Sequence, residues 1–212
     1  MAAARRPVTV LLVRHGTTAT TGKVLPGRAP GLHLSEAGRS QAEAAAARIA
    51  ALADVRAVYA SPLERAQETA APIARATGRR VRTTEGLNEC DFGAWTGRKL
   101  ADLRRLAAWR QVQEVPSGFR FPGGESFTEM QTRICGTLGE LADRHRGGAI
   151  VVVSHADPIK AAVAQAAGTP LDLFQRIVIS PCSVTVIAYG GHGPLVLTVN
   201  STGDDLRTLR PS

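Results

Sequence analysis

The chain has 212 residues, of which 44% are hydrophobic and 21% are charged, as is typical of one α/β domain with a sizeable core. No run is long and apolar enough to span a bilayer, and the amino-terminal segment lacks the apolar stretch of a secretory signal, so we expect a cytoplasmic protein with no membrane partner. The net charge of +8 is spread along the chain and only 4% of residues are aromatic, which argues against a nucleic-acid partner.

The chain is predicted to be organised as one domain. Residues 1–7 are expected to form a flexible tail and residues 8–212 the domain, because no repeat and no low-complexity linker divides them. The three cysteines are scattered without paired spacing, which predicts reduced thiols and no structural metal. The sequence does not fix the oligomeric state, although a homodimer is compatible with it.

The first predicted strand, residues 8–13, is followed by two reactive side chains. Its apolar, β-branched residues are typical of a buried central strand, and Arg14 and His15 come at its carboxyl end, where α/β sheets place ligands. Neutral imidazole is a nucleophile near neutral pH, and a guanidinium fits the oxygens of a phosphate. The pair suggests attack on phosphorus, and the alternative is an ordinary loop or core histidine.

Residues 17–30 have the Gly-rich and Pro-rich composition of a loop. Thr17, Thr18 and Arg28 in this loop carry groups that donate hydrogen bonds to anions. We therefore expect them to be further phosphate ligands, and the alternative is a turn-rich connection without a binding role.

A second candidate phosphate clamp lies at the start of a helix. Ser35 is predicted to cap an Ala-rich helix, and a short strand, residues 55–60, follows it. Ser61 is expected to cap the next helix, with Pro62 in its first helical position. Because helix N-termini attract anions, Arg65 near this end is suited to hold a phosphate.

A third strand, near residues 80–83, leads into a loop with two carboxyl groups. Glu89 and Asp91 lie in this Gly-containing loop beside aromatic residues, a setting that raises the pKa of a carboxyl group enough for acid–base chemistry. Glu89 is our candidate proton donor and Asp91 its structural neighbour. The alternative is an acidic surface turn.

The segment 105–122 is the least regular part of the chain and is predicted to form a lid over a substrate. Trp109, Phe119 and Arg120 would supply apolar and cationic contacts there. Together with Arg28, they are expected to line the substrate pocket.

A second apolar strand, residues 149–153, ends as the first one does, in this case with Ser154 and His155. On neighbouring parallel strands, the two strand ends would bring His15 and His155 to the same edge of the sheet. This pair is the strongest constellation of reactive residues in the sequence.

The remaining elements complete the predicted fold. A long helix runs from Ser126 to about Arg146, another starts at Asp157, and a hairpin is formed by residues 183–188 and 195–200. We expect a three-layer α/β/α sandwich with a mostly parallel central sheet and the hairpin at one edge.

Five stretches of the chain form an ordered set of motifs, which are residues 12–18, 61–70, 87–97, 122–126 and 153–155. In this order they resemble the motifs of the histidine phosphatase superfamily, branch 1, also called the phosphoglycerate mutase-like family. The resemblance runs from about Val8 to Ala167, and it implies the same three-layer fold.

The resemblance implies roles for the five central side chains. His15 would be phosphorylated, and Glu89 would protonate the leaving oxygen and later act as a base toward water. Arg14, Arg65 and His155 would hold the phosphoryl oxygens. Positioned cations stabilise such a group without a metal, so we expect neither a metal nor a cofactor.

Two positions depart from the family pattern. Thr21, six residues after His15, stands where many members have Asn, and Ala156 replaces the Gly that usually follows the second histidine. Because Thr21 is still able to donate one hydrogen bond, an altered phosphate contact is expected. Both residues are counted among the expected substrate-binding residues.

These observations predict a metal-independent phosphomonoesterase that acts on a small phosphorylated metabolite through a phosphohistidine. The alternative is a phosphomutase, which the short segment between Glu89 and Pro122 disfavours, because glycolytic phosphoglycerate mutases carry a longer insert there. A third hypothesis, motivated by Thr21 and Ala156, is a phosphate-binding protein without turnover. Sugar phosphates, phosphoglycerates and nucleotide-like esters all fit the expected pocket chemistry.

Overall fold

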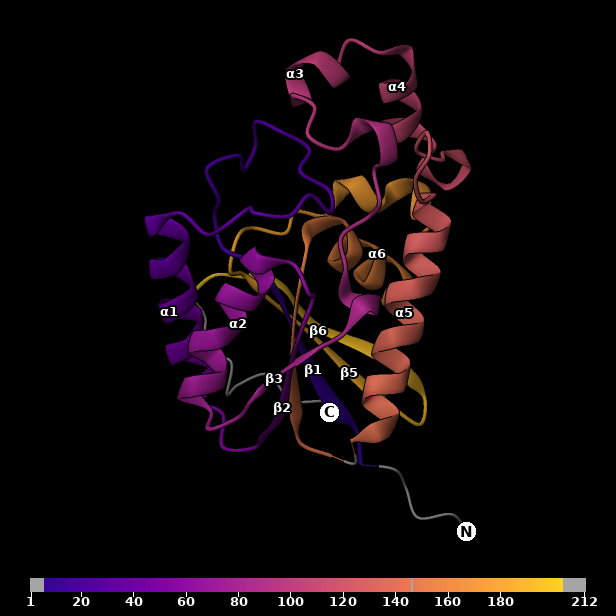
Figure 1. Ribbon diagram of the computed structural model, residues 1–212. Coiled ribbons are helices and arrows are strands. Elements are labelled where there is room, and N and C mark those ends of the chain that lie inside the picture. The colour runs from indigo at the N-terminus through magenta and orange to yellow at the C-terminus, as the bar shows by residue number, and fades with distance from the viewer. Residues whose placement is uncertain (1–5, 146, 204–212) are drawn as a thin grey trace.

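A six-stranded sheet with the strand order β3-β2-β4-β1-β5-β6 forms the centre of the computed structural model, which describes residues 6–145 and 147–203 (Figure 1). Its strands are β1 (Val8–Arg14), β2 (Val55–Ala60), β3 (Val81–Thr83), β4 (Ala149–Ser154), β5 (Val184–Gly190) and β6 (Gly193–Ser201). Strands β1 to β4 pair in parallel, whereas β5 is antiparallel to both of its neighbours. The predicted mostly parallel sheet with a hairpin at one edge is confirmed.

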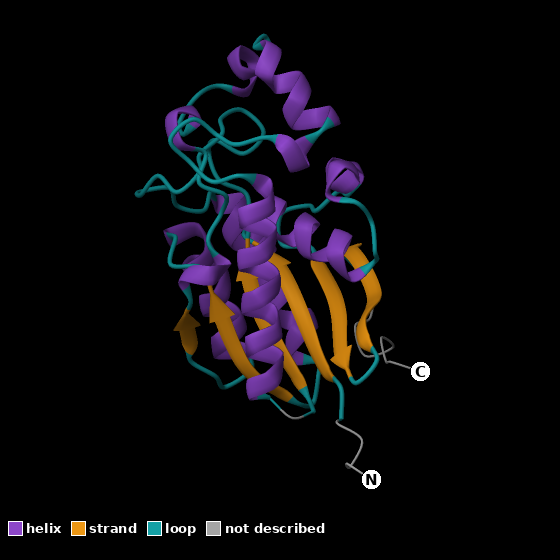
Figure 2. Ribbon diagram, turned by 90° about the vertical axis from the view of Figure 1, so that its right-hand side faces the viewer, coloured by secondary structure: helices purple, strands orange, loops and turns teal. Residues whose placement is uncertain are grey.

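Helices cover both faces of this sheet. Figures 1 and 2 show α1 (Glu36–Ala50) and α2 (Glu64–Ala76) on one face and α5 (Phe127–Arg144) and α6 (Ala156–Ala166) on the other. Side chains of a strand alternate between the faces, so Leu11 and Val13 of β1 pack with α1 and α2, while Val10 and Leu12 belong to the core that includes α5 and α6. One large apolar core therefore lies on each face of the sheet, and the predicted three-layer sandwich is confirmed.

The pairing of β1 with β4 sets the position of the two histidines. Arg14 lies opposite Ser154 in the parallel register, and the backbone N–H of His15 donates to the carbonyl of Ser154 at 3.0 Å. His15 and His155 therefore follow neighbouring strands at the same edge of the sheet, as the sequence predicted.

The helix caps are partly as predicted. Ser35 caps α1, because its hydroxyl accepts from the N–H of Gly38 at 3.1 Å, and Ser126 begins α5 with a capping box. The predicted start of α2 at Ser61 and Pro62 is wrong, since the helix begins at Glu64 and has no side-chain cap. The hydroxyl of Ser61 is engaged instead in the hydrogen-bond chain described below.

The segment 105–122 is more regular than predicted. It contains α4 (Ala107–Glu114), which Figure 1 shows together with α3 (Leu100–Leu103) beyond the carboxyl edge of the sheet. The indole of Trp109 stacks on Trp95 with ring centroids 6.3 Å apart, and Phe119 is 6% exposed in the same aromatic cluster. A lid role for this segment stays a prediction, but its aromatic side chains pack inward.

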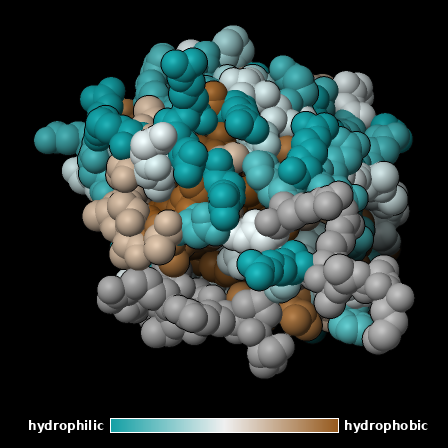
Figure 3. All heavy atoms as spheres, turned by 90° about the horizontal axis from the view of Figure 1, so that it is seen from below, coloured by the Kyte–Doolittle hydropathy of each residue, from teal (hydrophilic) through white to brown (hydrophobic). Residues whose placement is uncertain are grey.

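Some sequence predictions fall outside the described residues, namely residues 1–5 of the tail, Arg146 as the predicted helix end and residues 204–212 of the predicted domain. Within the described part, no helix is long and apolar enough to cross a membrane. The three cysteines are free. At the end of the molecule remote from the loops around His15, hydrophilic side chains lie beside a smaller hydrophobic area (Figure 3).

Candidate active site

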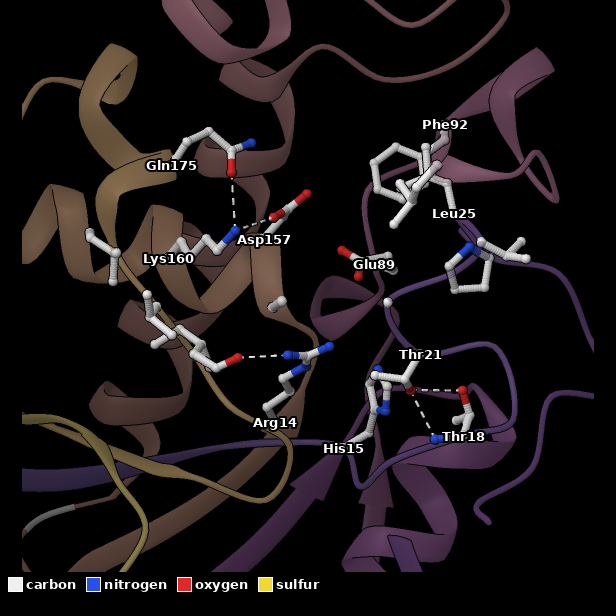
Figure 4. Close-up of a pocket in the computed structure, with 18 residues that line it drawn as sticks. Arg14, His15, Thr18, Thr21, Leu25, Glu89, Phe92, Asp157, Lys160 and Gln175 are labelled. Carbon is white, nitrogen blue, oxygen red and sulfur yellow. Dashed lines mark hydrogen bonds and ion pairs between the residues drawn. The ribbon is translucent and has the colours of Figure 1, made fainter. Parts of the chain in front are cut away.

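A cavity of about 370 Å³ opens at the carboxyl ends of β1 and β4. Arg14, His15 and Glu89 line it, and Figure 4 shows Glu89 above both Arg14 and His15. Parallel strands whose loops meet at one edge place ligands in this position. The cavity therefore coincides with the site expected from the strand ends.

His15 is held in one tautomer by its own loop. Its Nδ1 lies 2.8 Å from the carbonyl oxygen of Gly16, and because a carbonyl only accepts, Nδ1 carries the proton and Nε2 carries the lone pair. Burial, followed by the charges of Arg65 and Arg14, lowers the pKa of His15 to about 3. The imidazole is neutral at physiological pH and available as a nucleophile.

The guanidinium of Arg65 is fully buried with free donors. Its Nη2 donates to the carbonyl of Gly27 at 2.7 Å, but Nε and Nη1 have no hydrogen-bond partner among the described residues. Arg14 is similar, since its Nη1 donates to the carbonyl of Ile179 at 2.6 Å while Nε has no such partner. Burial lowers the pKa of both side chains. Buried N–H donors without partners are costly, and an oxyanion satisfies them.

A chain of side chains fixes His155. Its Nε2 lies 2.8 Å from the hydroxyl of Ser61, which donates to Oδ1 of Asn88 at 3.0 Å, and the amide of Asn88 donates to Glu85 at 2.7 Å. Since the Ser61 proton goes to Asn88, Nε2 of His155 is the donor and its Nδ1 has the lone pair. That Nδ1 is buried without a partner among the described residues, and the ring centroid is 5.2 Å from that of His15.

Glu89 is set up to exchange a proton near neutral pH. Its Oε1 accepts from the N–H of Cys90 at 2.9 Å. Burial, followed by the negative charge of Asp157, raises the pKa of Glu89 to about 7. A carboxyl group with this pKa is able to act as an acid and, after losing its proton, as a base.

The backbone of the loop that carries Glu89 is fixed by the ion pair between Arg133 and Glu125. Arg133 of α5 donates through Nη1 to the carbonyls of Gly86 and Asn88, both at 2.9 Å. The same guanidinium pairs with Glu125 at 2.7 Å and 2.9 Å. This arrangement fixes the backbone on which Glu89 stands.

Arg28 takes part in the same support and is not among the residues that line the cavity. Its Nε donates to the carbonyl of Glu89 at 2.8 Å, and its Nη2 donates to Glu125 at 2.9 Å. The guanidinium that the sequence assigned to phosphate or substrate therefore contacts the backbone of the Glu89 loop.

The predicted threonines are divided between the cavity and its surroundings. Thr18 and Thr21 line the cavity, as does Ala156, and the hydroxyl of Thr21 accepts from the N–H of Thr18 at 2.9 Å. Thr17 is not among the lining residues, and its N–H donates to the side chain of Gln41 at 3.0 Å.

The expected substrate contacts from segment 105–122 are not found in the cavity. Phe119 is buried in the core, Trp109 is partly buried against it, and Arg120 pairs with Glu129. The cavity walls come instead from residues that the sequence did not indicate, which include Val24, Leu25, Leu100, Lys160, Gln175, Ile177, Val178 and Ile179. These loop and helix-end residues have no periodic pattern that would reveal them. Ser61 and Asn88 were missed as partners of His155 for the same reason.

The model of the histidine phosphatase superfamily (branch 1) matches residues 10–202, which span the whole site. The chain belongs to the histidine phosphatase superfamily. This confirms the family and the fold that the five sequence motifs implied.

Relatives within the superfamily differ in length. The chain is 33% identical to the bifunctional protein Rv2228c of Mycobacterium tuberculosis, covering 93% of this chain but only 55% of the relative, so it spans about half of that protein. It is 31% identical to phosphoserine phosphatase 1 of Hydrogenobacter thermophilus, covering 92% of this chain and 93% of the relative. The solved structure of mycobacterial glucosyl-3-phosphoglycerate phosphatase Rv2419c matches with a TM-score of 0.82 and 26% identity, over 92% of this chain and 100% of that chain.

Proposed function

We propose that the protein is a phosphomonoesterase that hydrolyses a small phosphorylated metabolite through a phosphohistidine at His15. The observation that carries the proposal is the set of buried N–H donors of Arg65 and Arg14 that have no partner among the described residues and whose charges act on the neutral imidazole of His15. The likeness to phosphoserine phosphatase 1 and to glucosyl-3-phosphoglycerate phosphatase supports hydrolysis as the reaction.

In the first step, Nε2 of His15 attacks phosphorus and the bond to the ester oxygen breaks. Arg14 and Arg65 compensate the charge spread over the phosphoryl oxygens in the transition state. Glu89, protonated below its raised pKa of about 7, gives its proton to the leaving oxygen so that an alcohol departs.

In the second step, water attacks the phosphorus of phospho-His15. The Glu89 carboxylate left by the first step takes a proton from this water, and the bond between phosphorus and Nε2 breaks. Inorganic phosphate is released, and the neutral imidazole and the protonated carboxyl group are restored. Every proton and phosphoryl group transferred in the two steps comes from the protein, the ester or water.

His155, whose ring centroid is 5.2 Å from that of His15, is the second histidine that contacts the phosphoryl group in this proposal. Because its lone pair is on Nδ1, it binds a protonated phosphoryl oxygen as an acceptor, or it becomes a donor by taking up a proton. The chain of Ser61 and Asn88 keeps the ring in this orientation in both cases.

A cytoplasmic location is part of the proposal. Its support is the presence of three free cysteines, two of them buried, since reduced thiols are typical of a reducing compartment.

The experiment that tests the function measures inorganic phosphate released from a panel of phosphate esters, including 3-phosphoglycerate and phosphoserine, in the presence of EDTA. We expect steady release by the wild-type protein and a loss of at least about 10³-fold in His15→Ala. The matched control is His33→Ala, because the His33 side chain is 57% exposed and pairs with Glu68 away from the cavity.

Two outcomes would contradict the proposal. Undiminished release in His15→Ala would exclude the phosphohistidine route. Interconversion of phosphoglycerates in the presence of a bisphosphate primer, without net phosphate release, would identify a mutase instead.

A further inference from the structure

The part of the cavity next to Glu89 has an apolar side and a side formed by a paired acid and base. Leu25 and Phe92 lie on one side of Glu89, and Lys160 and Asp157 lie on the other (Figure 4). Leu100 and the consecutive residues 177–179 add further apolar surface to the lining. Because Glu89 protonates the leaving oxygen in the proposed reaction, the alcohol part of a substrate would lie among these groups.

Val178 is the most exposed of these residues. It is 66% exposed, the largest exposure among the large hydrophobic side chains of the described residues, and it lines the cavity between two other β-branched residues. An isolated exposed valine needs no explanation, but one that extends an apolar cavity wall is typical of a ligand-binding surface.

The cations of the cavity are already engaged. Of the described residues that line it, Arg14 and Lys160 are the positively charged ones, and Arg14 faces the phosphoryl group in the proposed mechanism. The ammonium of Lys160 donates to Asp157 at 3.1 Å and to Gln175 at 3.0 Å, and it lies 5.9 Å from the ring centroid of Phe174. An ammonium has three N–H groups, so little of its donor capacity is left for a ligand.

Asp157 makes this region unfavourable for anions. Its carboxylate pairs with Lys160 on the cavity wall, and its negative charge also acts on Glu89. A carboxylate on the alcohol part of a substrate would meet this charge without a free cation to offset it, and it would lose hydration among apolar side chains.

We propose that the alcohol part of the preferred substrate is uncharged and largely apolar. The substrate class is then a phosphate monoester of an aliphatic or aromatic alcohol, and phosphoglycerates and phosphoserine are poor substrates. This inference rests on the proposed function, because it places the alcohol from the role given to Glu89.

The test compares kcat/KM for ethyl, butyl and hexyl phosphate with that for 3-phosphoglycerate and phosphoserine. The three alkyl alcohols are similar leaving groups, so differences in kcat/KM among their phosphate esters report how the protein binds the alkyl group. Each fully buried methylene is worth about fourfold, and partial burial of four of them predicts an increase of roughly tenfold or more from ethyl to hexyl phosphate. The kcat/KM values for 3-phosphoglycerate and phosphoserine, which both carry a carboxylate, are expected to be lower than that for hexyl phosphate.

Two variants test the walls themselves. Val178→Ser is expected to lower the ratio of hexyl to ethyl phosphate about threefold, whereas Val115→Ser, at a 49% exposed valine that does not line the cavity, leaves it unchanged. Asp157→Asn is expected to raise the ratio of 3-phosphoglycerate to hexyl phosphate, because it frees Lys160. Any change that it causes in the pKa of Glu89 affects both esters and cancels in the ratio.

The outcomes separate the inference from the function on which it rests. Equal kcat/KM values for ethyl, butyl and hexyl phosphate would overturn the inference, and so would faster cleavage of 3-phosphoglycerate or phosphoserine than of hexyl phosphate. In both cases the release of phosphate would still support the proposed function. Absence of phosphate release from every ester would overturn both.

Discussion

Burial moves the pKa values of His15 and Glu89 in opposite directions. A buried base loses its proton more readily, so the pKa of His15 falls to about 3, and a buried acid keeps its proton, so the pKa of Glu89 rises to about 7. The result is a neutral nucleophile beside a protonated acid at the same pH. The same opposed pattern separates an acid from a nucleophile in other hydrolytic sites.

This pattern predicts the pH dependence of the reaction. The proton on Glu89 is needed in the first step and is lost as pH rises through about 7, so kcat/KM for hexyl phosphate is expected to fall above that pH. Glu89→Gln is expected to lower this rate about 10²- to 10⁴-fold and to remove the alkaline fall. In the same variant, kcat/KM for p-nitrophenyl phosphate is expected to fall less, because p-nitrophenolate leaves without needing a proton.

The control for this prediction is Glu114→Gln. Glu114 is a 56% exposed side chain that pairs with Arg110 outside the cavity, so its loss is expected to leave the pH profile unchanged. Equal losses for the alkyl and aryl esters in Glu89→Gln would contradict a role as proton donor.

The sequence predicted the residues at strand ends better than those that support them. Arg14, His15 and His155 follow apolar runs, and the ends of neighbouring parallel strands have to meet. Arg28 was assigned to phosphate because a loop arginine has no local signal that distinguishes a ligand contact from a backbone contact. Its partner Glu125 lies 97 residues away in the sequence, so only the fold reveals the pairing.

At the scale of elements, the first turn of α1 packs directly on the loop that follows β1. A Cβ added at Gly38 would lie 2.1 Å from the carbonyl oxygen of Thr17, and one added at Gly16 would lie 2.6 Å from the carbonyl oxygen of Gly38. The two glycines therefore allow a close approach of backbone to backbone, which positions His15 at the cavity.

We expect Gly38→Ala to force this loop away from α1. Overpacking of this kind costs about 1–3 kcal/mol in the free energy of unfolding. A displaced His15 is expected to lower kcat/KM by about tenfold or more, because reaction depends on its alignment with phosphorus. Chemical denaturation and phosphate-release kinetics measure the two effects.

Gly136→Ala is the matched control. Gly136 lies inside α5 with nothing within 4 Å of an added Cβ, so alanine is expected to stabilise the helix by up to about 1 kcal/mol and to leave activity unchanged. If the two variants behaved alike, the close contact between α1 and the loop would have no role.

Element prediction succeeded where a pattern is continuous and failed where it is not. The apolar runs of β1 and β4 and the Ala-rich helix α1 were predicted to within a few residues. Segment 105–122 is predicted to be a lid because it is the least regular part of the sequence. In the structure, Trp109 and Phe119 pack on Trp95, a contact that depends on the chain returning over itself.

At the scale of the whole molecule, no single element contains the site. The nucleophile follows β1, one guanidinium comes from α2, the proton donor stands on a loop tied to α5, and the second histidine follows β4. These parts are brought together only when the sheet is assembled and covered on both faces (Figure 1). The cavity is therefore a product of the complete fold of the described residues.

The central claim is that the phosphoryl group passes through His15, and the most direct test identifies the phosphorylated residue. The protein is mixed with p-nitrophenyl phosphate, quenched in alkali to preserve a phosphohistidine, digested and analysed by mass spectrometry. We predict a phosphoryl group on the peptide that contains His15, and none in His15→Ala. Phosphorylation of another residue, or normal turnover by His15→Ala, would contradict the account.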